Sequence, residues 1–408
     1  MASETIYRDI VARIEPFIGT DNILVLHGAR QVGKTHILYL LIDHLKQRGE
    51  TTVFIDLEDS RKAEILDSGV EAFLAYLNGA GFAAGAFGNG KKLFVFIDEI
   101  QYLENPSSFL KLIADHHKYM QLIVSGSSSF AIKSKFTDSL AGRTVDFEIY
   151  NLSFEEFLRF KGEKYGLRGA TGAYHLANLV KLYEEYVLYG GYPKIVLENS
   201  VEKKETYLQQ IIDTYVRKDI GDLAGIRDVR KFNSLVKLLA SQSGQLLNAA
   251  AAAKTCALAV QTVRNYLFIL ENTYVIKLVA PFSSSAKVEV VKAPKIFFLD
   301  TGLARMLRFK RLSAELPGDA FETSVFSELV KKYGSRDINY WRNRNQNEID
   351  FILNLRRKLV PCEVKESFAN FRRGAMSSFC DKYKVEDYKV AGIRGEKKDG
   401  HCVYPWEL

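Results

Sequence analysis

The stretch Gly28-Ala29-Arg30-Gln31-Val32-Gly33-Lys34-Thr35 decides how the first third of this 408-residue chain folds. It matches the pattern GxxxxGK[ST], and it lies between an apolar run at 23–26 and a helical stretch at 35–48. Glycines let the backbone turn tightly, so that successive N–H groups and the start of the next helix face a phosphate chain. In that arrangement Lys34 reaches the β- and γ-phosphates, and the Thr35 hydroxyl coordinates Mg²⁺. We therefore expect residues 28–35 to bind the phosphates of a nucleotide.

Short apolar runs alternate with helical stretches from residue 22 to about residue 150. The runs are continuous in hydrophobicity, as expected for strands that are covered on both faces in a parallel sheet. They lie at 23–26, 53–57, 93–97, 122–125 and 147–150. The predicted fold class is therefore α/β, with the parallel sheet of a P-loop NTPase.

An acidic pair, Asp98-Glu99, ends the apolar run 93–97. At the carboxyl end of a strand beside the phosphate loop, Asp98 can hold the magnesium ion, and Glu99 can polarise the attacking water. A small polar residue after the next run, Ser127 or Ser125, can sense the γ-phosphate. The expected cofactors are ATP and Mg²⁺, and the expected activity is ATP hydrolysis.

Arg143 follows this region in the sequence Ala141-Gly142-Arg143. One interpretation makes it a catalytic arginine finger that stabilises charge, acting in its own site or in that of a neighbouring molecule. The other makes it a partner in a surface ion pair. The residue pattern does not choose between them.

The composition indicates a globular protein, with 47% hydrophobic and 26% charged residues. The charge balance of 56 basic against 49 acidic residues gives +7, which permits a polyanionic partner without requiring one. Four cysteines lie far apart without a CxxC pair, which favours a reducing cytoplasm. All apolar runs are much shorter than the ~20 residues that cross a bilayer, so we expect a cytoplasmic protein without membrane contact.

The middle of the chain is helical, and a possible DNA-binding module follows it. Helices expected at 230–241, 249–255 and 259–270 precede strand-like segments at 274–279 and 287–292, which is the order of a winged helix. The third helix has the polar face of a recognition helix but only one arginine, Arg264. Contact with double-stranded DNA, protein packing and dimerisation all remain open for it.

Two alternating segments near the C-terminus, 347–353 and 359–365, are expected to pair as a hairpin through a loop at 355–358. If Asn354 faces Leu359, the same register places Asp350 opposite Glu363, with Lys365 on the same face. Two facing carboxylates repel each other unless a cation lies between them, and Mg²⁺ suits oxygen ligands. The opposite face would fill the core with Ile349, Phe351, Leu353, Val360, Cys362 and Val364. The alternative is a solvated row of charges on a sheet.

Short motifs along nearly the whole chain carry a resemblance to a known family. They are GARQVGKT at 28–35, FIDLED at 54–59, IDEIQ at 97–101, SGSS at 125–128, SLAGR at 139–143, LSFEEF at 152–157, YGGYP at 189–193 and FFLDTGL at 297–303. These segments resemble AAA+-related ATPases of the AAA_14 type whose C-terminal part is the DUF4143 domain. The resemblance implies a P-loop ATPase domain, a helical connector, a winged helix and a C-terminal α/β domain similar to PD-(D/E)xK nucleases. We expect boundaries at 1–160, 161–228, 229–305 and 306–408.

The nuclease resemblance assigns roles to residues of the last domain. Asp350, Glu363 and Lys365 match the Asp…Glu-x-Lys pattern, with Mg²⁺ between the carboxylates, and Glu328 resembles the glutamate of the preceding helix. The proline expected before Asp350 is replaced by Ile349. Three functions are thus in view: an ATPase coupled to a DNA-related module, an ATP-regulated nuclease, or a nucleotide-gated module that binds a protein partner or forms an oligomer.

Overall fold

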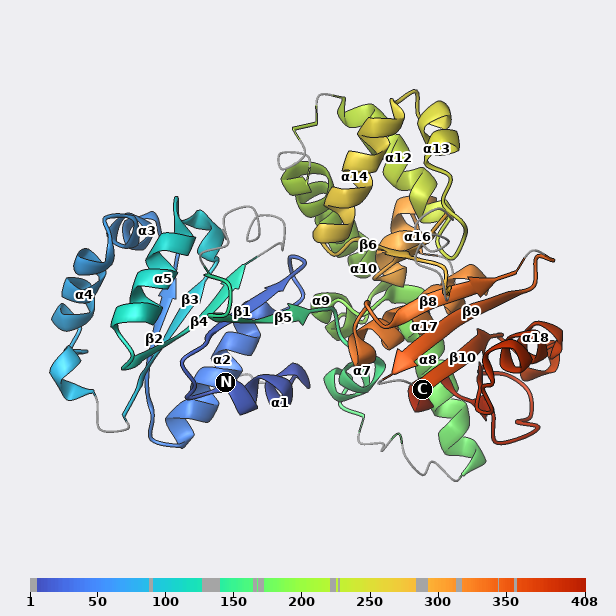
Figure 1. The fold of residues 1–408 in the computed structure, drawn as a ribbon, viewed down its shortest axis with the longest axis horizontal. Coiled ribbons are helices and arrows are strands. Elements are labelled where there is room, and N and C mark those ends of the chain that lie inside the picture. Colours follow the sequence, from blue (N-terminus) through green and yellow to red (C-terminus); the bar gives the residue numbers. More distant parts are fainter. Residues whose placement is uncertain are drawn as a thin grey trace. The chain divides into compact units, whose positions relative to one another are not determined.

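The computed structural model describes residues 6–87, 91–126, 140–163, 167, 172–220, 225–226, 228–283, 293–312, 318–343, 345–355 and 358–408. The chain divides into two compact units, Met1–Tyr150 and Asn151–Leu408 (Figure 1). The first unit therefore ends at Tyr150, before the expected boundary at 160, and the three later segments share the second unit. Within the described residues, no helix combines the length and the apolar character needed to cross a membrane.

A five-stranded parallel sheet forms the centre of the first unit, in the order β2-β3-β4-β1-β5. Each strand contains or overlaps one of the expected apolar runs, so the predicted parallel α/β sheet is confirmed. The strands are β1 (Ile23–Gly28), β2 (Thr51–Asp56), β3 (Leu93–Asp98), β4 (Met120–Gly126) and β5 (Thr144–Ile149). Every residue of β1, β3 and β4 is buried, which explains why these runs are apolar without alternation.

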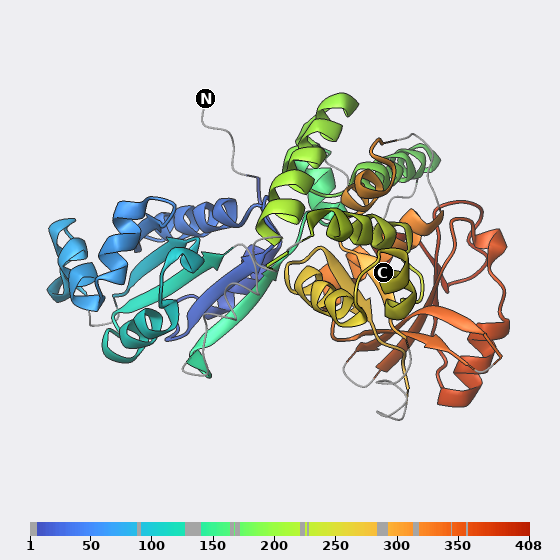
Figure 2. The ribbon, with the colours of Figure 1, turned by 90° about the horizontal axis from the view of Figure 1, so that it is seen from above.

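Helices cover both faces of this sheet (Figure 2). One face packs against the later helices of the unit, through side chains such as Phe73 and Phe109, in a common apolar core with Val25, Val95 and Val124. The other face packs against α2. The helices are α1 (Ile10–Ile14), α2 (Lys34–Gln47), α3 (Ser60–Asp67), α4 (Val70–Gly79) and α5 (Pro106–His116).

The second unit begins with helices and a short β-ribbon. After the helical part, three helices precede β6 and β7, which pair antiparallel. The expected strand at 287–292 lies outside the described residues, and the partner of β6 is the later segment Lys295–Phe298. The elements are α7 (Phe154–Phe160), α8 (Ala173–Tyr189), α9 (Pro193–Leu197), α10 (Val201–Ile211) with a π-helical continuation (Ile212–Asp219), α12 (Val229–Ser241), α13 (Ala249–Thr255), α14 (Val260–Asn272), β6 (Ile276–Val279) and β7 (Lys295–Phe298).

A second five-stranded sheet, β12-β11-β10-β9-β8, follows two helices. Its elements are α16 (Thr301–Phe309), α17 (Gly318–Tyr333), β8 (Ile338–Arg342), β9 (Glu348–Leu355), β10 (Lys358–Val364), α18 (Gly374–Tyr383), β11 (Lys389–Ala391) and β12 (Cys402–Val403). Strands β9 and β10 are antiparallel and Asn354 pairs with Leu359, as the sequence predicted. Leu355 pairs with Lys358, so strand pairing continues into the ends of the expected loop. The six side chains predicted for the core face of this hairpin are all buried.

Asp300 is a buried carboxylate that connects two motifs whose chemical role the sequence pattern does not reveal. Its side chain caps α16 by accepting a hydrogen bond from the Leu303 N–H (2.7 Å), and it also accepts one from the Gly191 N–H (2.9 Å). The Asn151 amide is a third donor. At Gly190, which has φ +80°, an added Cβ would lie 2.3 Å from this carboxylate. Asp300 of the DTG motif therefore binds the backbone of the YGGYP motif directly, and the close approach requires glycine at position 190.

Candidate functional site

The loop before α2 is shaped to hold an anion. Gly33 (φ 93°, ψ 31°) precedes the first helical residue and has no side chain to cap the helix, which leaves its first N–H groups for a ligand. At Gly28 an added Cβ would lie 2.1 Å from the Ile149 carbonyl oxygen, so only glycine fits between β1 and β5. The loop also has Gln31 in the left-handed region, at φ 63°. These features match the predicted phosphate loop.

Lys34 lies inside this loop and is only 5% exposed. Its Nζ donates hydrogen bonds to the carbonyl oxygens of Gly28 (3.1 Å) and Ala29 (3.0 Å). Burial lowers the pKa of this ammonium, while the nearby carboxylates of Glu99 and Asp98 act in the opposite direction. The lysine ammonium is thus held inside the loop by two backbone carbonyl groups.

Thr35 and Asp98 meet at the carboxyl edge of the sheet. The Thr35 hydroxyl donates to the Asp98 carboxylate, with 2.6 Å between Oγ1 and Oδ2. Asp98 ends β3 and Gly28 ends β1, and β4 lies between these two strands. Parallel strands bring their carboxyl ends to one edge, which explains why residues 63 positions apart touch.

Ser125, near the end of β4, completes the contacts of Asp98. Its hydroxyl donates to the other carboxylate oxygen of Asp98, and the Glu99 N–H donates to the Ser125 Oγ (3.3 Å). Ser127 lies outside the described residues, so its expected sensing role stays a prediction. Of the two serines considered, Ser125 is the one with a described contact to the acidic pair.

Glu99 has an unusual backbone and a partner that the sequence analysis missed. Its φ of 57° and ψ of 49° lie in the left-handed region, which non-glycine residues adopt rarely. Its carboxylate accepts a hydrogen bond from the Gln101 amide. The motif IDEIQ contains this glutamine, two residues after Glu99, but spacing alone gave it no role. The backbone of Glu99 is thus held by a tertiary contact to Ser125, and its side chain by a local contact to Gln101.

The donors at this site fit a magnesium nucleotide. A hydroxyl and a carboxylate oxygen, from Thr35 and Asp98, are the hard ligands that Mg²⁺ prefers. Among the residues that the structure describes, no group of three or more His, Cys, Asp or Glu side chains is arranged to hold a metal ion. Mg²⁺ with few protein ligands usually takes the remaining ones from phosphates and water, and a nucleotide held by the adjacent loop would supply the phosphates.

Arg8 contacts the backbone of the phosphate loop. The sequence analysis did not identify this residue. This arginine is 3% exposed, and its guanidinium donates to the Val32 carbonyl oxygen (2.7 Å) and to the Tyr150 carbonyl oxygen (3.0 Å). One side chain thus ties the phosphate loop to the residue that follows β5. A single arginine in the segment before α1 has no sequence signal that would reveal this position.

The structure does not bring Arg143 to the phosphate loop of its own chain. Thr144 pairs with Ile23 at the start of β1, whereas Ile149 pairs with Gly28 at its end. Arg143 therefore lies at the amino edge of the sheet, and the loop is at the carboxyl edge. Its guanidinium pairs with Asp115 (Nε–Oδ1 2.7 Å), and this contact lowers the pKa of that carboxyl group. The ion-pair interpretation holds, and a finger acting on its own site is excluded by this geometry.

The three residues predicted from the hairpin do come together in the second unit. Lys365 Nζ lies 2.7 Å from Glu363 Oε1 and 3.7 Å from Asp350 Oδ2. The Val364 N–H donates to Asp350 Oδ2 (2.8 Å). Burial, followed by the charge of Asp350, raises the pKa of Glu363 to about 7. Where the sequence analysis expected Mg²⁺, the lysine and the N–H group thus engage oxygens of both carboxylates.

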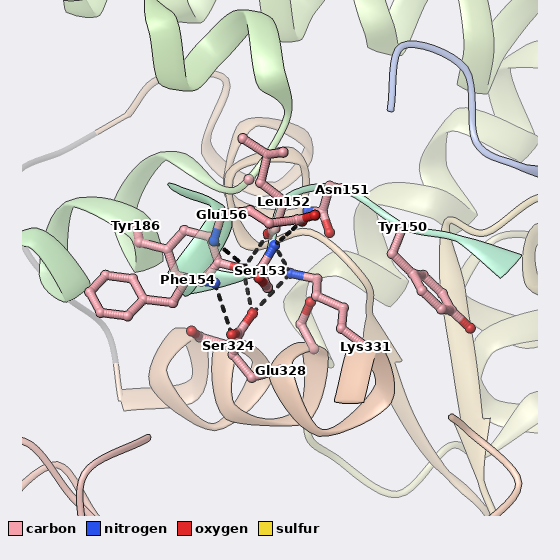
Figure 3. Close-up of polar contacts among 12 residues, drawn as sticks. Tyr150, Asn151, Leu152, Ser153, Phe154, Glu156, Tyr186, Ser324, Glu328 and Lys331 are labelled. Carbon is pink, nitrogen blue, oxygen red and sulfur yellow. Dashed lines mark hydrogen bonds and ion pairs between the residues drawn. The ribbon is translucent and has the colours of Figure 1, made fainter. Parts of the chain in front are cut away.

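The assignment of Glu328 to this cluster was wrong. Figure 3 shows Glu328 directed from α17 toward the start of α7. There Glu328 Oε2 accepts a hydrogen bond from the Phe154 N–H (2.9 Å), and Glu328 Oε1 lies 3.0 Å from Lys331 Nζ. The glutamate of α17 that faces the cluster is Glu322, whose pKa is raised to about 7 by burial and by the charge of Asp350. Six residues correspond to about 240° around a helix, so the two glutamates point to different faces.

Lys295 is a further member of the cluster that the sequence analysis missed. It comes from β7, and its Nζ lies 3.2 Å from Glu322 Oε1, 2.7 Å from Glu348 Oε1 and 3.7 Å from Asp350 Oδ1. The carboxylate–lysine cluster therefore comprises Lys295, Glu322, Glu348, Asp350, Glu363 and Lys365. Its lysine from β7 is more than fifty positions from the hairpin, so no local spacing could indicate it.

Three family models match successive parts of the chain. Residues 20–158 match an AAA domain, residues 180–315 match a domain of unknown function (DUF8612), and residues 317–406 match another (DUF4143). An uncharacterized protein of Haemophilus influenzae is 28% identical over 344 residues, which is 82% of this chain and 80% of that protein. An uncharacterized protein of Methanocaldococcus jannaschii is 27% identical over 359 residues, covering 86% of this chain and 75% of the other.

Among solved structures, a Walker-type ATPase of Pyrococcus abyssi is similar with a TM-score of 0.46 and 15% identity. The similarity covers 74% of this chain and 95% of that one. With the parallel sheet and the phosphate loop described above, the domain matches identify the architecture. The first unit thus has the α/β fold of P-loop NTPases, and the chain carries an AAA domain match at 20–158 followed by a DUF4143 domain match at 317–406.

Proposed function

We propose that the first unit binds ATP with Mg²⁺ at residues 28–35 and hydrolyses it. The observation that carries this proposal is the 2.6 Å hydrogen bond between Thr35 and Asp98, next to the buried ammonium of Lys34. It joins the phosphate loop to the acidic end of β3 within one small site. Bound Mg²⁺ would neutralise charge on the phosphates, as it does in other P-loop enzymes.

The chain's own groups have distinct roles in this proposal. Lys34 would exchange its two carbonyl partners for oxygens of the β- and γ-phosphates, which stabilises their charge in a poorly solvated loop. Glu99 would accept a proton from the attacking water, while the amide of Gln101 holds the Glu99 carboxylate in position. Ser125 would keep Asp98 and Glu99 in register through its two hydrogen bonds.

Substitution of Lys34 and Glu99 tests the two steps separately. Lys34→Ala should abolish ATP binding, measured with a fluorescent ATP analogue, whereas Glu99→Gln should bind ATP but hydrolyse it at least about 10²-fold more slowly. Lys46→Ala is a matched control, because Lys46 lies on the exposed side of the same helix. Native turnover in the Lys34→Ala variant would overturn the proposal.

A second proposed function concerns duplex DNA and rests on the exposed face of α14. Gln261, Arg264 and Asn265 are exposed there, whereas the opposite face is buried against the rest of the module. We propose that this face contacts double-stranded DNA, in the manner of a winged helix. Binding should weaken steeply with salt, and Arg264→Ala should reduce that salt dependence. Binding to a protein partner or to a second copy, without salt-dependent DNA affinity, is the contrary outcome.

The ATP-regulated nuclease is the alternative for the C-terminal sheet. It predicts metal-dependent nicking of DNA that is lost in Asp350→Ala, Glu363→Ala and Lys365→Ala. These residues do lie together, but lysine side chains already neutralise their carboxylates. The geometry therefore favours the ATPase as the activity of this protein.

A further inference from the structure

We infer that Lys295 takes the place of a divalent cation in the carboxylate–lysine cluster, so that this cluster is closed by an internal ammonium group and does not bind Mg²⁺. The Nζ of Lys295 has carboxylate oxygens from three different residues within 4 Å: Glu348 at 2.7 Å, Glu322 at 3.2 Å and Asp350 at 3.7 Å. Lys295 is only 2% exposed. One positive charge thus sits among oxygens that come from both α17 and β9.

Both oxygens of Asp350 and one oxygen of Glu363 already have partners within the protein. Asp350 Oδ1 faces Lys295, and Asp350 Oδ2 accepts the Val364 N–H (2.8 Å) and lies 3.7 Å from Lys365 Nζ. Glu363 Oε1 is paired with the same Lys365 at 2.7 Å. Mg²⁺ demands near-octahedral oxygen coordination, and here two ammonium groups within 4 Å of one carboxylate would repel it.

The packing of β7 holds Lys295 in this position. The strand pairs with β6, where Lys295 lies opposite Val279. Two residues along and on the same face of the strand, the Phe297 ring stacks on Phe326 (4.4 Å between centroids) and contacts Phe351 (5.5 Å). Withdrawal of the lysine would therefore disturb an aromatic cluster that joins β7, α17 and β9.

The charges of the cluster keep Lys295 protonated. Burial by itself lowers the pKa of a lysine, but the carboxylates of Glu322, Asp350 and Glu348 raise the pKa of Lys295 above its usual value. The ion pairs of the cluster consequently connect the β6–β7 ribbon to the C-terminal sheet. Phosphodiester cleavage that depends on a metal at Asp350 and Glu363 is not expected of it.

Direct measurement of Mn²⁺ binding tests this inference without reference to activity. The full chain would carry Asp98→Asn to weaken the nucleotide site, and bound Mn²⁺ would be measured by electron paramagnetic resonance without nucleotide. We expect no saturable site in this parent at millimolar Mn²⁺. Adding Lys295→Met should create one site. Its Mn²⁺ affinity should exceed that of the parent by roughly tenfold or more, because one opposing charge is removed. That site should vanish when Asp350→Asn is also introduced.

Lys389→Met is the matched control, because Lys389 lies on β11 of the same sheet and its ammonium pairs with Asp387, which is not a member of the cluster. It should leave Mn²⁺ binding at the level of the parent. The inference is overturned if the parent binds Mn²⁺ at a site that Asp350→Asn removes, or if a folded Lys295→Met variant gains no site. Should Lys295→Met fail to fold, the comparison of the parent with and without Asp350→Asn still decides.

Discussion

The Thr35 hydroxyl lies 2.6 Å from the Asp98 carboxylate, although 63 positions separate the two residues in the chain. Thr35 belongs to the first turn of α2, and Asp98 is the last residue of β3. The contact fixes the phosphate loop against the acidic end of a buried strand. Both side chains carry oxygen atoms at this contact, as the proposed Mg²⁺ site requires.

Replacing Asp98 by asparagine should separate metal use from nucleotide affinity. Asp98→Asn keeps the contact to Thr35 but removes the negative charge that attracts Mg²⁺. We expect hydrolysis to fall by about 10²-fold or more, and the Mg²⁺ concentration for half-maximal activity to rise, while metal-free nucleotide binding changes little. A magnesium titration of ATPase activity measures the first two effects, and equilibrium binding in EDTA measures the third.

Asp56→Asn is the control for that variant. Asp56 ends the neighbouring strand β2 and lies directly opposite Asp98 in the sheet register. Its carboxylate accepts only a local hydrogen bond from Glu58 N–H among the contacts described for it (2.9 Å). Asp56→Asn should therefore retain native magnesium dependence, and an equal loss in both variants would contradict a specific role for Asp98.

Gln101→Ala should slow hydrolysis without weakening ATP binding. The amide of Gln101 donates to the Glu99 carboxylate, so its removal frees the carboxylate to leave the position for proton transfer. The loss of one such hydrogen bond corresponds to about tenfold in kcat, with KM changed much less. Steady-state kinetics at varied ATP distinguish the two constants. A native kcat in this variant, together with a slow Glu99→Gln variant, would show that Glu99 acts without the help of Gln101.

The phosphate loop and the hairpin register could be predicted because their signals are local. Eight consecutive residues define the loop, and the alternation on β9 and β10 fixes which side chains share a face. The residues that contact these motifs in the folded structure are harder to predict. Arg143 was undecided because sequence spacing does not tell which edge of a parallel sheet a residue occupies.

The sequence did not reveal residues whose role depends on the orientation of a helix or on a distant strand. Helix α17 is buried on most sides, so its apolar pattern does not show which of Glu322 and Glu328 faces the hairpin. The partners of the two glutamates lie in other elements. The first N–H group of α7 donates a hydrogen bond to Glu328, and Lys295 of β7 forms an ion pair with Glu322. Both partners lie far away in the sequence, and no spacing rule links them.

Asp300→Ala should destabilise the second unit strongly. The substitution removes the cap of α16 and leaves the buried donors of Gly191 and Asn151 without their acceptor. We expect a loss of about 3 kcal/mol or more in the free energy of unfolding, measured by urea denaturation. Asp300→Asn retains an acceptor oxygen and should lose less. Asp228→Ala removes the cap of α12 at an exposed position and should cost about 1 kcal/mol. Equal losses in the two alanine variants would contradict the role of burial.

The stability of the second unit should depend on pH through Glu322. Burial and the charge of Asp350 raise the pKa of Glu322 from 4.5 to about 7, so the folded protein holds a proton that the unfolded chain releases between these values. The stability contribution of this group is therefore greatest at low pH and is lost as the pH rises through about 7. Glu322→Gln cannot titrate, so the variant should gain stability relative to the native protein, by about 1–3 kcal/mol, between about pH 5 and about pH 8. Urea denaturation at both pH values measures this difference, with the exposed Glu202→Gln as the control. A difference that is independent of pH, as expected for the control, would show that Glu322 titrates normally despite its burial.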